Sequence, residues 1–199
     1  MSWKRGAYPE FNLEDALAVI FMLKNPIGRK AISEELGLGE GSVRTLLKKL
    51  SAIGIITSRQ KGHFLNERGA RLLENLQELF SEPIKAGTVE GMPAVAMKVK
   101  NPPEFKSIEL RDEAIRFFAK GAMILIVRNG EPVFPEDGRK LKETFPEIAQ
   151  SIRSLAPEEG DLIVITWTED DADALKSAIH VAVFLKENQL PEEIVNLTR

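Results

Sequence analysis

Apolar residues recur at helical spacing near the start of the 199-residue chain, beginning with residues 12–24. The apolar positions of this segment form a broad stripe, which indicates a helix that packs on several sides. Asn12 can cap the helix at its start, and Asp15 lies three residues later, in the capping-box position. Asn25-Pro26 predicts its end, because the residue before a proline disfavours helical backbone.

Two further helices are predicted on either side of a glycine-containing turn. Residues 28–36 predict a short helix, and Gly37-Leu38-Gly39 predicts the tight turn that follows it. The next helix is expected to begin at residues 40–42 and to run to about Ile53, and Gly54 supplies its stop. Its apolar stripe has helical spacing and consists of Val43, Leu46, Leu47, Leu50 and Ile53.

A β-hairpin and a fourth helix are predicted after the third helix. Ile55-Ile56-Thr57 has β-branched strand character, Lys61-Gly62 can turn the chain, and His63-Phe64-Leu65 can return as the second strand. Residues 66–80 then resume the helical spacing of apolar residues. The predicted order is helix, helix, turn, helix, hairpin, helix. Two helices joined by a short glycine-containing turn form a helix-turn-helix unit.

Strands and helices alternate in the remainder of the chain, after a short linker predicted at residues 81–87. Asn129-Gly130 predicts a hairpin turn, and Pro132 marks the strand after it as an edge strand. Pro146 predicts a kink or break within its helix. The expected strands are 93–100, 123–127, 131–134 and 161–167, and the expected helices are 108–120, 138–154 and 171–187.

The order β-α-β-β-α-β-α begins with the six elements of a split βαβ, or ferredoxin-like, arrangement. A profilin-like or other α/β sandwich is an alternative. The fold class is therefore predicted as α+β, with one domain in residues 1–82 and a small α/β sandwich in residues 83–199. One side of the first helix of this sandwich is expected to be apolar and to hold Ile108, Leu110, Ile115 and Phe118.

Charge divides the chain close to the same boundary. Residues 1–85 contain 13 Lys and Arg against 10 Asp and Glu, whereas residues 86–199 contain 14 against 20. No acidic residue stands between Glu40 and Glu67, although five basic residues do. Such a difference between two halves of a chain indicates a polyanionic partner for the basic half.

The segment GRKAISEELGLGEGSVRTLLKKLSAIGIITSRQKGHFLNERG resembles the winged helix-turn-helix domain of prokaryotic, especially archaeal, transcription regulators. The resemblance rests on the turn LGLGEGSVR, on LSAIGII between the third helix and the first hairpin strand, and on LNERG after the hairpin. It covers roughly residues 10–80. It implies a fold in which the hairpin is the wing, and it implies binding to double-stranded DNA.

The third helix is expected to enter the major groove, where residues near a helix N-terminus reach base edges. Arg44 is the candidate for a bidentate contact to guanine, Ser42 and Thr45 could bond bases or phosphates, and Lys48 and Lys49 are placed to touch phosphates. The alternative is an ordinary solvated helix face. Such a face usually mixes both charges, and this one does not.

Basic residues outside the third helix extend the predicted DNA-binding surface. In the wing, Arg59, Lys61 and His63 could lie beside the backbone or enter the minor groove. The alternative is a charged hairpin that protects an edge strand from pairing. Arg29 and Lys30 stand in the first turn of the second helix, where their positive charges are repelled by the positive end of the helix dipole. A bound phosphate would offset this repulsion.

The second domain offers two arginines and a tryptophan as candidates for binding a small effector. Arg111 or Arg116 could hold an anionic group, because arginine favours planar bidentate recognition, and Trp167 could line a cavity. The alternatives are a helical ion pair between Asp112 and Arg116 and a tryptophan that belongs to the core.

The remaining polar motifs favour structural roles. The acidic run at residues 168–173 favours capping of the last helix by Thr168 or Asp170 over a metal site, because the EF-hand spacing and glycine are absent. His180 stands among apolar residues and is expected to be a packed helix residue. No catalytic or nucleotide-binding motif is present, so no enzyme, cofactor or metal ion is predicted.

Composition narrows the class of protein further. The chain has no cysteine, which excludes disulfides and cysteine-ligated zinc. It has no apolar run near the ~18 residues of a membrane span, and no apolar segment follows the basic residues at its N-terminus. A cytoplasmic protein without a membrane partner is therefore expected. Scarce Gln with abundant Lys, Arg and Glu suits a thermophile.

The predicted function is that of a sequence-specific DNA-binding transcriptional regulator whose second domain senses a small-molecule effector or forms a homodimer. A dimer would read two half-sites about one helical turn apart. Two alternatives stay open. An enzyme with a winged-helix module would show polar residues converging in a cleft, whereas a protein-interaction adaptor would bind a protein partner and no duplex.

Overall fold

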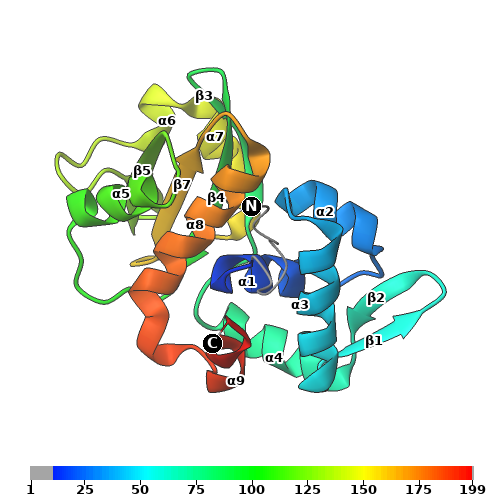
Figure 1. Cartoon of the computed structure of the whole chain (residues 1–199). Coiled ribbons are helices and arrows are strands. Elements are labelled where there is room, and N and C mark those ends of the chain that lie inside the picture. The colour runs from blue at the N-terminus through cyan, green and yellow to red at the C-terminus, as the bar shows by residue number, and fades with distance from the viewer. Residues whose placement is uncertain (1–10, 199) are drawn as a thin grey trace, which may run out of the picture. The chain divides into compact units, whose positions relative to one another are not determined.

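The computed structural model describes residues 11–198, which divide into two compact units (Figure 1). The first unit holds the described residues up to Glu74 together with those from Pro191 onward, and the second holds Asn75–Leu190. The division thus differs from the sequence-based boundaries, because the last residues of the chain belong to the first unit. Among the described helices, none combines the length and the hydrophobicity that crossing a membrane requires.

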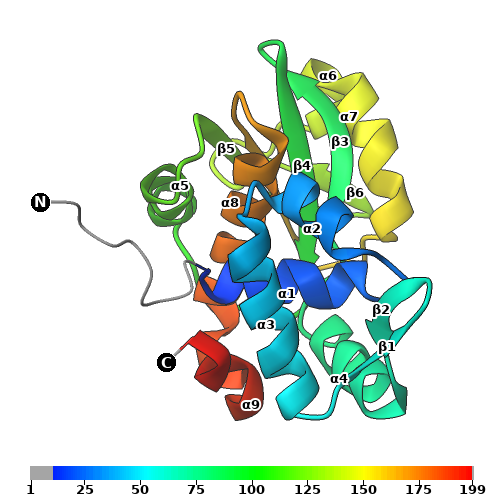
Figure 2. The ribbon, with the colours of Figure 1, turned by 45° about the vertical axis from the view of Figure 1, so that its right-hand side comes forward.

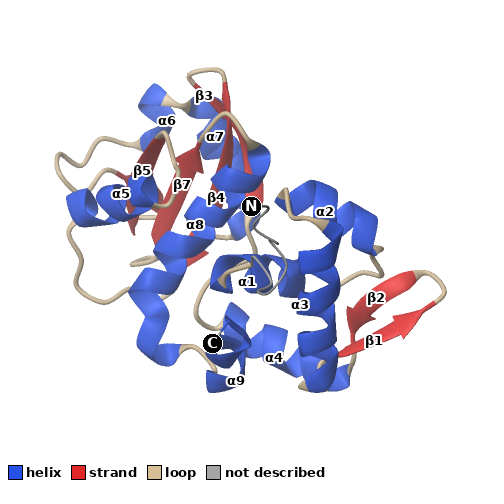
Figure 3. Ribbon diagram, in the orientation of Figure 1, coloured by secondary structure: helices blue, strands red, loops and turns tan. Residues whose placement is uncertain are grey.

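The first unit has the predicted order of helix, helix, turn, helix, hairpin and helix. The predicted capping box is confirmed: the Asn12 side chain accepts from the Asp15 amide at 2.9 Å, and the Asp15 carboxylate accepts from the Asn12 amide at 3.0 Å. Figure 3 shows the hairpin in red beside α3. The elements are α1 (Leu13–Met22), α2 (Arg29–Leu36), α3 (Glu40–Ala52), β1 (Ile56–Arg59), β2 (Gly62–Leu65) and α4 (Glu67–Gln77).

The hairpin is joined to the segment before α2 by backbone hydrogen bonds. The Ile27 amide donates to the His63 carbonyl at 3.0 Å, and the His63 amide donates to the Ile27 carbonyl at 2.9 Å. Gly62 makes this approach possible, because a Cβ there would lie 2.4 Å from the Ile27 carbonyl oxygen. The chain turns at Gln60 and Lys61, one residue earlier than predicted.

The start of α4 is held by the sequence LNERG. The Asn66 side chain accepts from the Gly69 amide at 3.0 Å and donates to the Gly54 carbonyl at 2.9 Å. Gly69 lies so close to the backbone of Ile55 that a Cβ there would stand 2.1 Å from the Ile55 carbonyl oxygen. Asn66 and Gly69 therefore fix where α4 packs after the hairpin.

The end of the chain packs on α1 and α3 within the first unit, through α9 (Glu192–Val195) and the 3-10 turn η3 (Asn196–Thr198). Ile194 and Leu197 are buried there. The Lys49 ammonium donates to the Leu197 carbonyl at 2.5 Å, and Arg68 pairs with Glu193 at 2.6 Å. The sequence does not predict this segment, because two buried residues on single helical turns give no periodic signal.

The second unit is built on a five-stranded sheet in the order β3-β4-β7-β5-β6, in which every pair is antiparallel. Pro132 lies in the edge strand β6, as predicted, and β7 is the buried central strand. The strands are β3 (Ile84–Val89), β4 (Met92–Val99), β5 (Gly121–Arg128), β6 (Glu131–Val133) and β7 (Leu162–Trp167).

Helices cover both faces of this sheet. Figure 2 shows α5 and α8 on one side of β3 and β4, and α6 and α7 on the other. The apolar core on the second side combines alternate strand residues with Leu141, Ile148 and Ile152. The predicted break at Pro146 is confirmed by two short helices. The bounds are α5 (Ser107–Arg116), α6 (Leu141–Thr144), α7 (Pro146–Ser151), the 3-10 turn η1 (Ile152–Leu155), α8 (Asp171–Lys186) and the 3-10 turn η2 (Glu187–Gln189).

The α+β class is confirmed, but the ferredoxin-like strand order is wrong. A ferredoxin-like sheet would place the strand at residues 131–134 between the strands at 93–100 and 123–127, whereas β7 lies there, antiparallel to both, and β6 stands at the edge. The predicted linker at residues 81–87 is also wrong in part, because β3 begins at Ile84 and pairs with β4. Its proline and glycine obscured a strand that forms a tight hairpin with β4, in which Val89 pairs with Met92.

The single apolar side predicted for the helix at residues 108–120 is wrong as well. Leu110 and Ala114 are the buried residues of α5. Ile108, Ile115 and Phe118 are 58%, 53% and 67% exposed. The helix also ends at Arg116, and Phe118 lies beyond it with a φ of 74°. Ile108 and Ile115 of α5 are thus exposed, whereas Leu110 and Ala114 are buried.

The close contact at Gly69 generates a stability prediction. We expect Gly69→Ala to lower the free energy of unfolding by about 1–3 kcal/mol, the cost of adding a group to a filled contact. Gly41→Ala is the matched control, because a Cβ there meets nothing within 4 Å and alanine favours the helix. Chemical denaturation followed by circular dichroism measures both variants, and equal stability would contradict the prediction.

Candidate functional site

A hollow of about 370 Å³ lies in the first unit between α2, α3 and the hairpin. Four residues predicted from the sequence to bind DNA line it, although they come from three separate elements. No ion pair involves Arg29, Arg44 or Lys48 within residues 11–198. The lining residues are Arg29, Arg44, Leu47, Lys48, Ser51, Ser58 and His63, and we call this surface the basic hollow.

Helical spacing brings one face of α3 to the basic hollow. Arg44, Lys48 and Ser51 follow one another at intervals of four and three residues, which places them on one side of the helix. The predicted apolar stripe of α3 is buried, apart from the partly exposed Ile53 beyond the helix end. Arg29 is the first residue of α2, whose N-cap Gly28 provides no side-chain cap. Its guanidinium therefore stands at the positive end of a helix dipole.

His63 contributes the hairpin side of the basic hollow. It pairs with Ser58 across the two strands, and its Nδ1 lies 2.7 Å from the Ser58 hydroxyl oxygen. Partial burial, and then the positive charge of Arg29, hold the pKa of His63 below its ordinary value. The imidazole is therefore mostly neutral at pH 7, and an added anion nearby would favour its protonated form.

Other residues predicted on α2 and α3 point elsewhere or have partners. Lys49 turns to the end of the chain, where it donates to the Leu197 carbonyl. The Thr45 hydroxyl donates to the Gly41 carbonyl at 3.0 Å, within its own helix. Lys30 pairs with Glu34 at 3.8 Å. Ser42 is partly exposed and does not line the basic hollow.

The two charged residues at the tip of the hairpin are exposed and do not line the basic hollow. The Arg59 guanidinium lies 5.2 Å from the centre of the Phe64 ring, a cation–π distance. Lys61 lies in the turn. Neither residue forms an ion pair within the described part of the chain.

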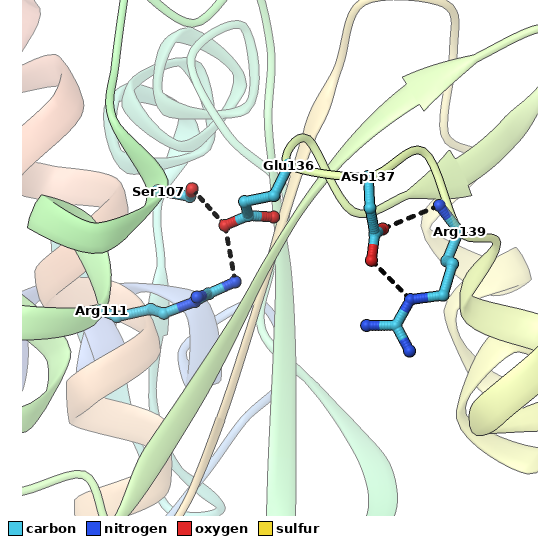
Figure 4. A network of polar contacts seen from close by, with 5 residues as sticks. All are labelled: Ser107, Arg111, Glu136, Asp137 and Arg139. Atoms are coloured by element: carbon cyan, nitrogen blue, oxygen red, sulfur yellow. Dashed lines mark hydrogen bonds and ion pairs between the residues drawn. The ribbon is translucent and has the colours of Figure 1, made fainter.

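The second unit contains an open cleft of about 1070 Å³ beside the N-terminal half of α5. Of the three ligand-binding candidates, Arg111 lines this cleft. Its guanidinium lies 2.9 Å from a carboxylate oxygen of Glu136, and the Ser107 hydroxyl donates to the same oxygen at 2.5 Å (Figure 4). Asp137 and Arg139 form a separate pair at 2.6 Å beside this network.

The other two candidates lie outside the cleft. Arg116 is exposed and pairs with Glu113, so the predicted partner Asp112 is wrong. Trp167 packs against the sheet core, as in the core alternative. A Cβ at residue 121 would collide with the Trp167 ring, which explains why this residue is a glycine. The Trp167 indole nitrogen is buried and has no hydrogen-bond partner among the described residues.

The structural roles predicted for Asp170 and His180 are confirmed. The Asp170 side chain caps α8 by accepting from the amides of Ala172 and Asp173 at 2.8 and 3.2 Å. The His180 ring stacks on Phe117 at 4.2 Å between ring centres, and its Nε2 lies 3.4 Å from the Glu113 carboxylate.

Sequence reasoning missed several residues of the two sites. Ser51 continues the helical spacing of Arg44 and Lys48, so the same period that found them could have found it. Ser58 required the hairpin register, which follows from the position of the turn. Glu136 and Arg128 line the second cleft through loops and strand ends, and no local pattern marks them.

Comparisons with known proteins match most of the chain. Residues 12–71 match the family described as the PH0730-like N-terminal domain, and residues 90–185 match a domain of unknown function, DUF4443. The chain is similar to a solved structure, the hypothetical protein PH0730 from Pyrococcus horikoshii OT3, with 59% sequence identity and a TM-score of 0.89. That match covers 94% of this chain and 100% of the other. No curated protein matches the chain.

The position of Arg29 generates a titration prediction. We expect Arg29→Gln to raise the pKa of His63 toward its ordinary value, because one of the two effects that lower it is removed. Lys30→Gln is the control, since Lys30 lies beside Arg29 on α2 and outside the basic hollow. Nuclear magnetic resonance of the imidazole protons against pH measures the shift. An unchanged His63 titration in Arg29→Gln would contradict the placement of these two residues.

Proposed function

This chain belongs to the PH0730-like protein family, and we propose that it is a DNA-binding transcriptional regulator whose first unit is a winged helix-turn-helix domain. In this proposal α2 and α3 are the helix-turn-helix pair, α3 is the recognition helix and the β1–β2 hairpin is the wing. The basic hollow is the observation that carries the proposal. It gathers the cationic side chains of Arg29, Arg44 and Lys48 from two helices, beside His63 of the hairpin, and none of the three forms an ion pair within the described residues.

The two basic residues of α3 in the hollow have different proposed roles. Arg44 lies in the N-terminal half of α3 and is exposed, which suits a bidentate contact to guanine in the major groove. Lys48 lies one turn further along and suits a phosphate contact, which positions the protein without specifying sequence. A phosphate near Arg29 would also relieve the unfavourable position of that charge at the start of α2.

The wing extends this surface through two exposed cations. Arg59 and Lys61 form no ion pair within residues 11–198, so both side chains are available to pair with the phosphates of a nucleic-acid backbone. Both suit phosphate or minor-groove contacts. Lys49 is left out of the proposed interface, because its ammonium is used by the carbonyl of Leu197.

The second unit is proposed to sense a small effector or to form a homodimer. A two-fold dimer would present two α3 helices to half-sites about one helical turn apart. Ligand binding would regulate DNA affinity if it favoured one spacing of these helices. A regulator of this kind acts on DNA in the cytoplasm of a prokaryote.

One observation favours a second candidate function, that of a protein-interaction adaptor. Four large apolar side chains are exposed on α5, just beyond it and on α8, namely Ile108, Ile115, Phe118 and Phe184. Exposed apolar surface of this kind is a feature of sites that bind other proteins. An adaptor would bind its protein partner without any affinity for duplex DNA, so the DNA measurement below separates the two functions.

The basic hollow predicts how DNA affinity depends on salt. We expect Lys48→Ala to reduce the slope of log affinity against log salt by about one, because one phosphate contact is lost. On a duplex selected from random sequence, Arg44→Ala should cost about 1–3 kcal/mol of binding free energy and relax base preference at one position. Fluorescence anisotropy of a labelled duplex measures both quantities.

Arg71→Ala is the charge-matched control for this measurement, because Arg71 is exposed on α4 and paired with Glu67. It should leave the slope unchanged. Unchanged affinity and slope in the double variant Arg44→Ala, Lys48→Ala would show that α3 does not contact DNA.

His63 predicts a pH dependence of the same binding. Its pKa is lowered in the free protein, so protonation there requires a pH below the ordinary value. A bound phosphate raises the pKa of His63, and DNA binding should therefore take up protons and tighten as the pH falls from about 8 to about 6. His63→Gln should flatten this dependence. A wild-type affinity independent of pH over that interval would contradict the prediction.

A further inference from the structure

The cleft of the second unit has the size and lining of a small-molecule site. Its volume of about 1070 Å³ is slightly above the ~300–1,000 Å³ typical of ligand pockets. One wall is the segment from Asn101 to the first turns of α5. The opposite wall is formed by Ile126 and Arg128 of β5 together with Pro135 and Glu136.

The apolar part of the lining can take the body of an organic molecule. Phe105 and Ile108 come from the α5 side, and Ile126 comes from the sheet. Prolines 102, 103 and 135 stiffen the segments around them, because each fixes its own φ. An aromatic or branched aliphatic body would replace water on these surfaces, which is favourable.

The charged part of the lining is cationic at two places. Arg128 ends β5, is exposed and has no ion pair within the described residues. Arg111 is occupied by Glu136, whose carboxylate oxygen also accepts from Ser107. Partial burial raises the pKa of Glu136, but the hydrogen bond from Ser107, one from its own backbone amide and the charge of Arg111 outweigh it, so the pKa lies below its ordinary value. Glu136 is therefore ionised at neutral pH.

The Glu136 carboxylate binds Arg111 in the way that the carboxylate of a bound small molecule would. The Arg111 and Glu136 side chains are 31% and 45% exposed, so their ion pair is open to exchange with a competing anion. Arg128 offers a second guanidinium in the same cleft without such a competitor.

We propose that this cleft binds a small organic anion, with its carboxylate, phosphate or sulfonate group on Arg128 and its apolar body against Phe105, Ile108 and Ile126. Glu136 competes with the anion for Arg111 and lowers its affinity. Binding at the cleft does not require that the chain binds DNA. The role of the bound anion as an effector rests on the proposed regulatory function.

The probe for this site is 8-anilino-1-naphthalenesulfonate, an anion with a planar apolar body, measured by fluorescence on the full chain. Arg128→Gln should weaken it at least about fivefold, the loss expected for a partly exposed charged hydrogen bond. Glu136→Gln should strengthen it about threefold, because a competing charge is removed. Both variants should leave the binding of uncharged N-phenyl-1-naphthylamine unchanged.

Arg116→Gln is the matched control, since Arg116 is an exposed arginine at the end of α5 and lies outside the cleft. It should change the binding of neither dye. The proposal is overturned if Arg128→Gln binds the anionic dye like the wild type. It is also overturned if Phe118→Ser abolishes binding whereas Arg128→Gln does not, because the dye would then lie on the exposed apolar residues.

A duplex titration separates this inference from the proposed function. A chain that binds the anionic dye through Arg128 but binds no duplex supports the cleft and overturns the regulator. A chain that binds duplex but loses no dye affinity in Arg128→Gln overturns the cleft and leaves the regulator standing. If both bind and a saturating dye changes duplex affinity in the wild type only, the cleft is an effector site.

Discussion

The first unit depends on one close backbone contact, the pair of hydrogen bonds between Ile27 and His63. The contact forms because residue 62 is glycine, and any side chain there would collide with the Ile27 carbonyl. Since Ile27 stands two residues before α2, the contact brings Arg29 next to His63. Partial burial, and then the positive charge of Arg29, lower the pKa of His63. The backbone contact thereby contributes to keeping this imidazole neutral on the proposed DNA-binding surface.

Helix α3 contacts the core, the basic hollow and the end of the chain through different side chains. Its apolar stripe packs in the core, Arg44 and Lys48 face the basic hollow, and Lys49 binds the carbonyl of Leu197. Adjacent helical residues point about 100° apart, so two neighbouring lysines reach different partners. The end of the chain therefore packs directly against the proposed recognition helix. This arrangement limits how far α3 can move within its unit.

In the second unit the apolar core and the polar cleft lie in different places. The central strand β7 is buried between two neighbours, and helices close both faces of the sheet. The cleft lies beside this packed centre, where β5 ends and α5 begins. Polar groups there keep their charges because they remain partly exposed, and Glu136 holds Arg111 in place. Such a cleft can change occupant without disturbing the core.

The sequence by itself determined the elements whose cause is local. Helical spacing located α1 to α4, the capping box at Asn12 began α1, and Pro132 marked an edge strand. The same spacing predicted that Arg44 and Lys48 share one face, because side-chain direction in a helix follows from residue number. Only the tertiary structure decided the docking of the chain end on α3 and the meeting of Arg29 with His63. Each of these joins segments distant in sequence, and the burial and backbone pairing that fix such contacts leave no periodic pattern in either partner.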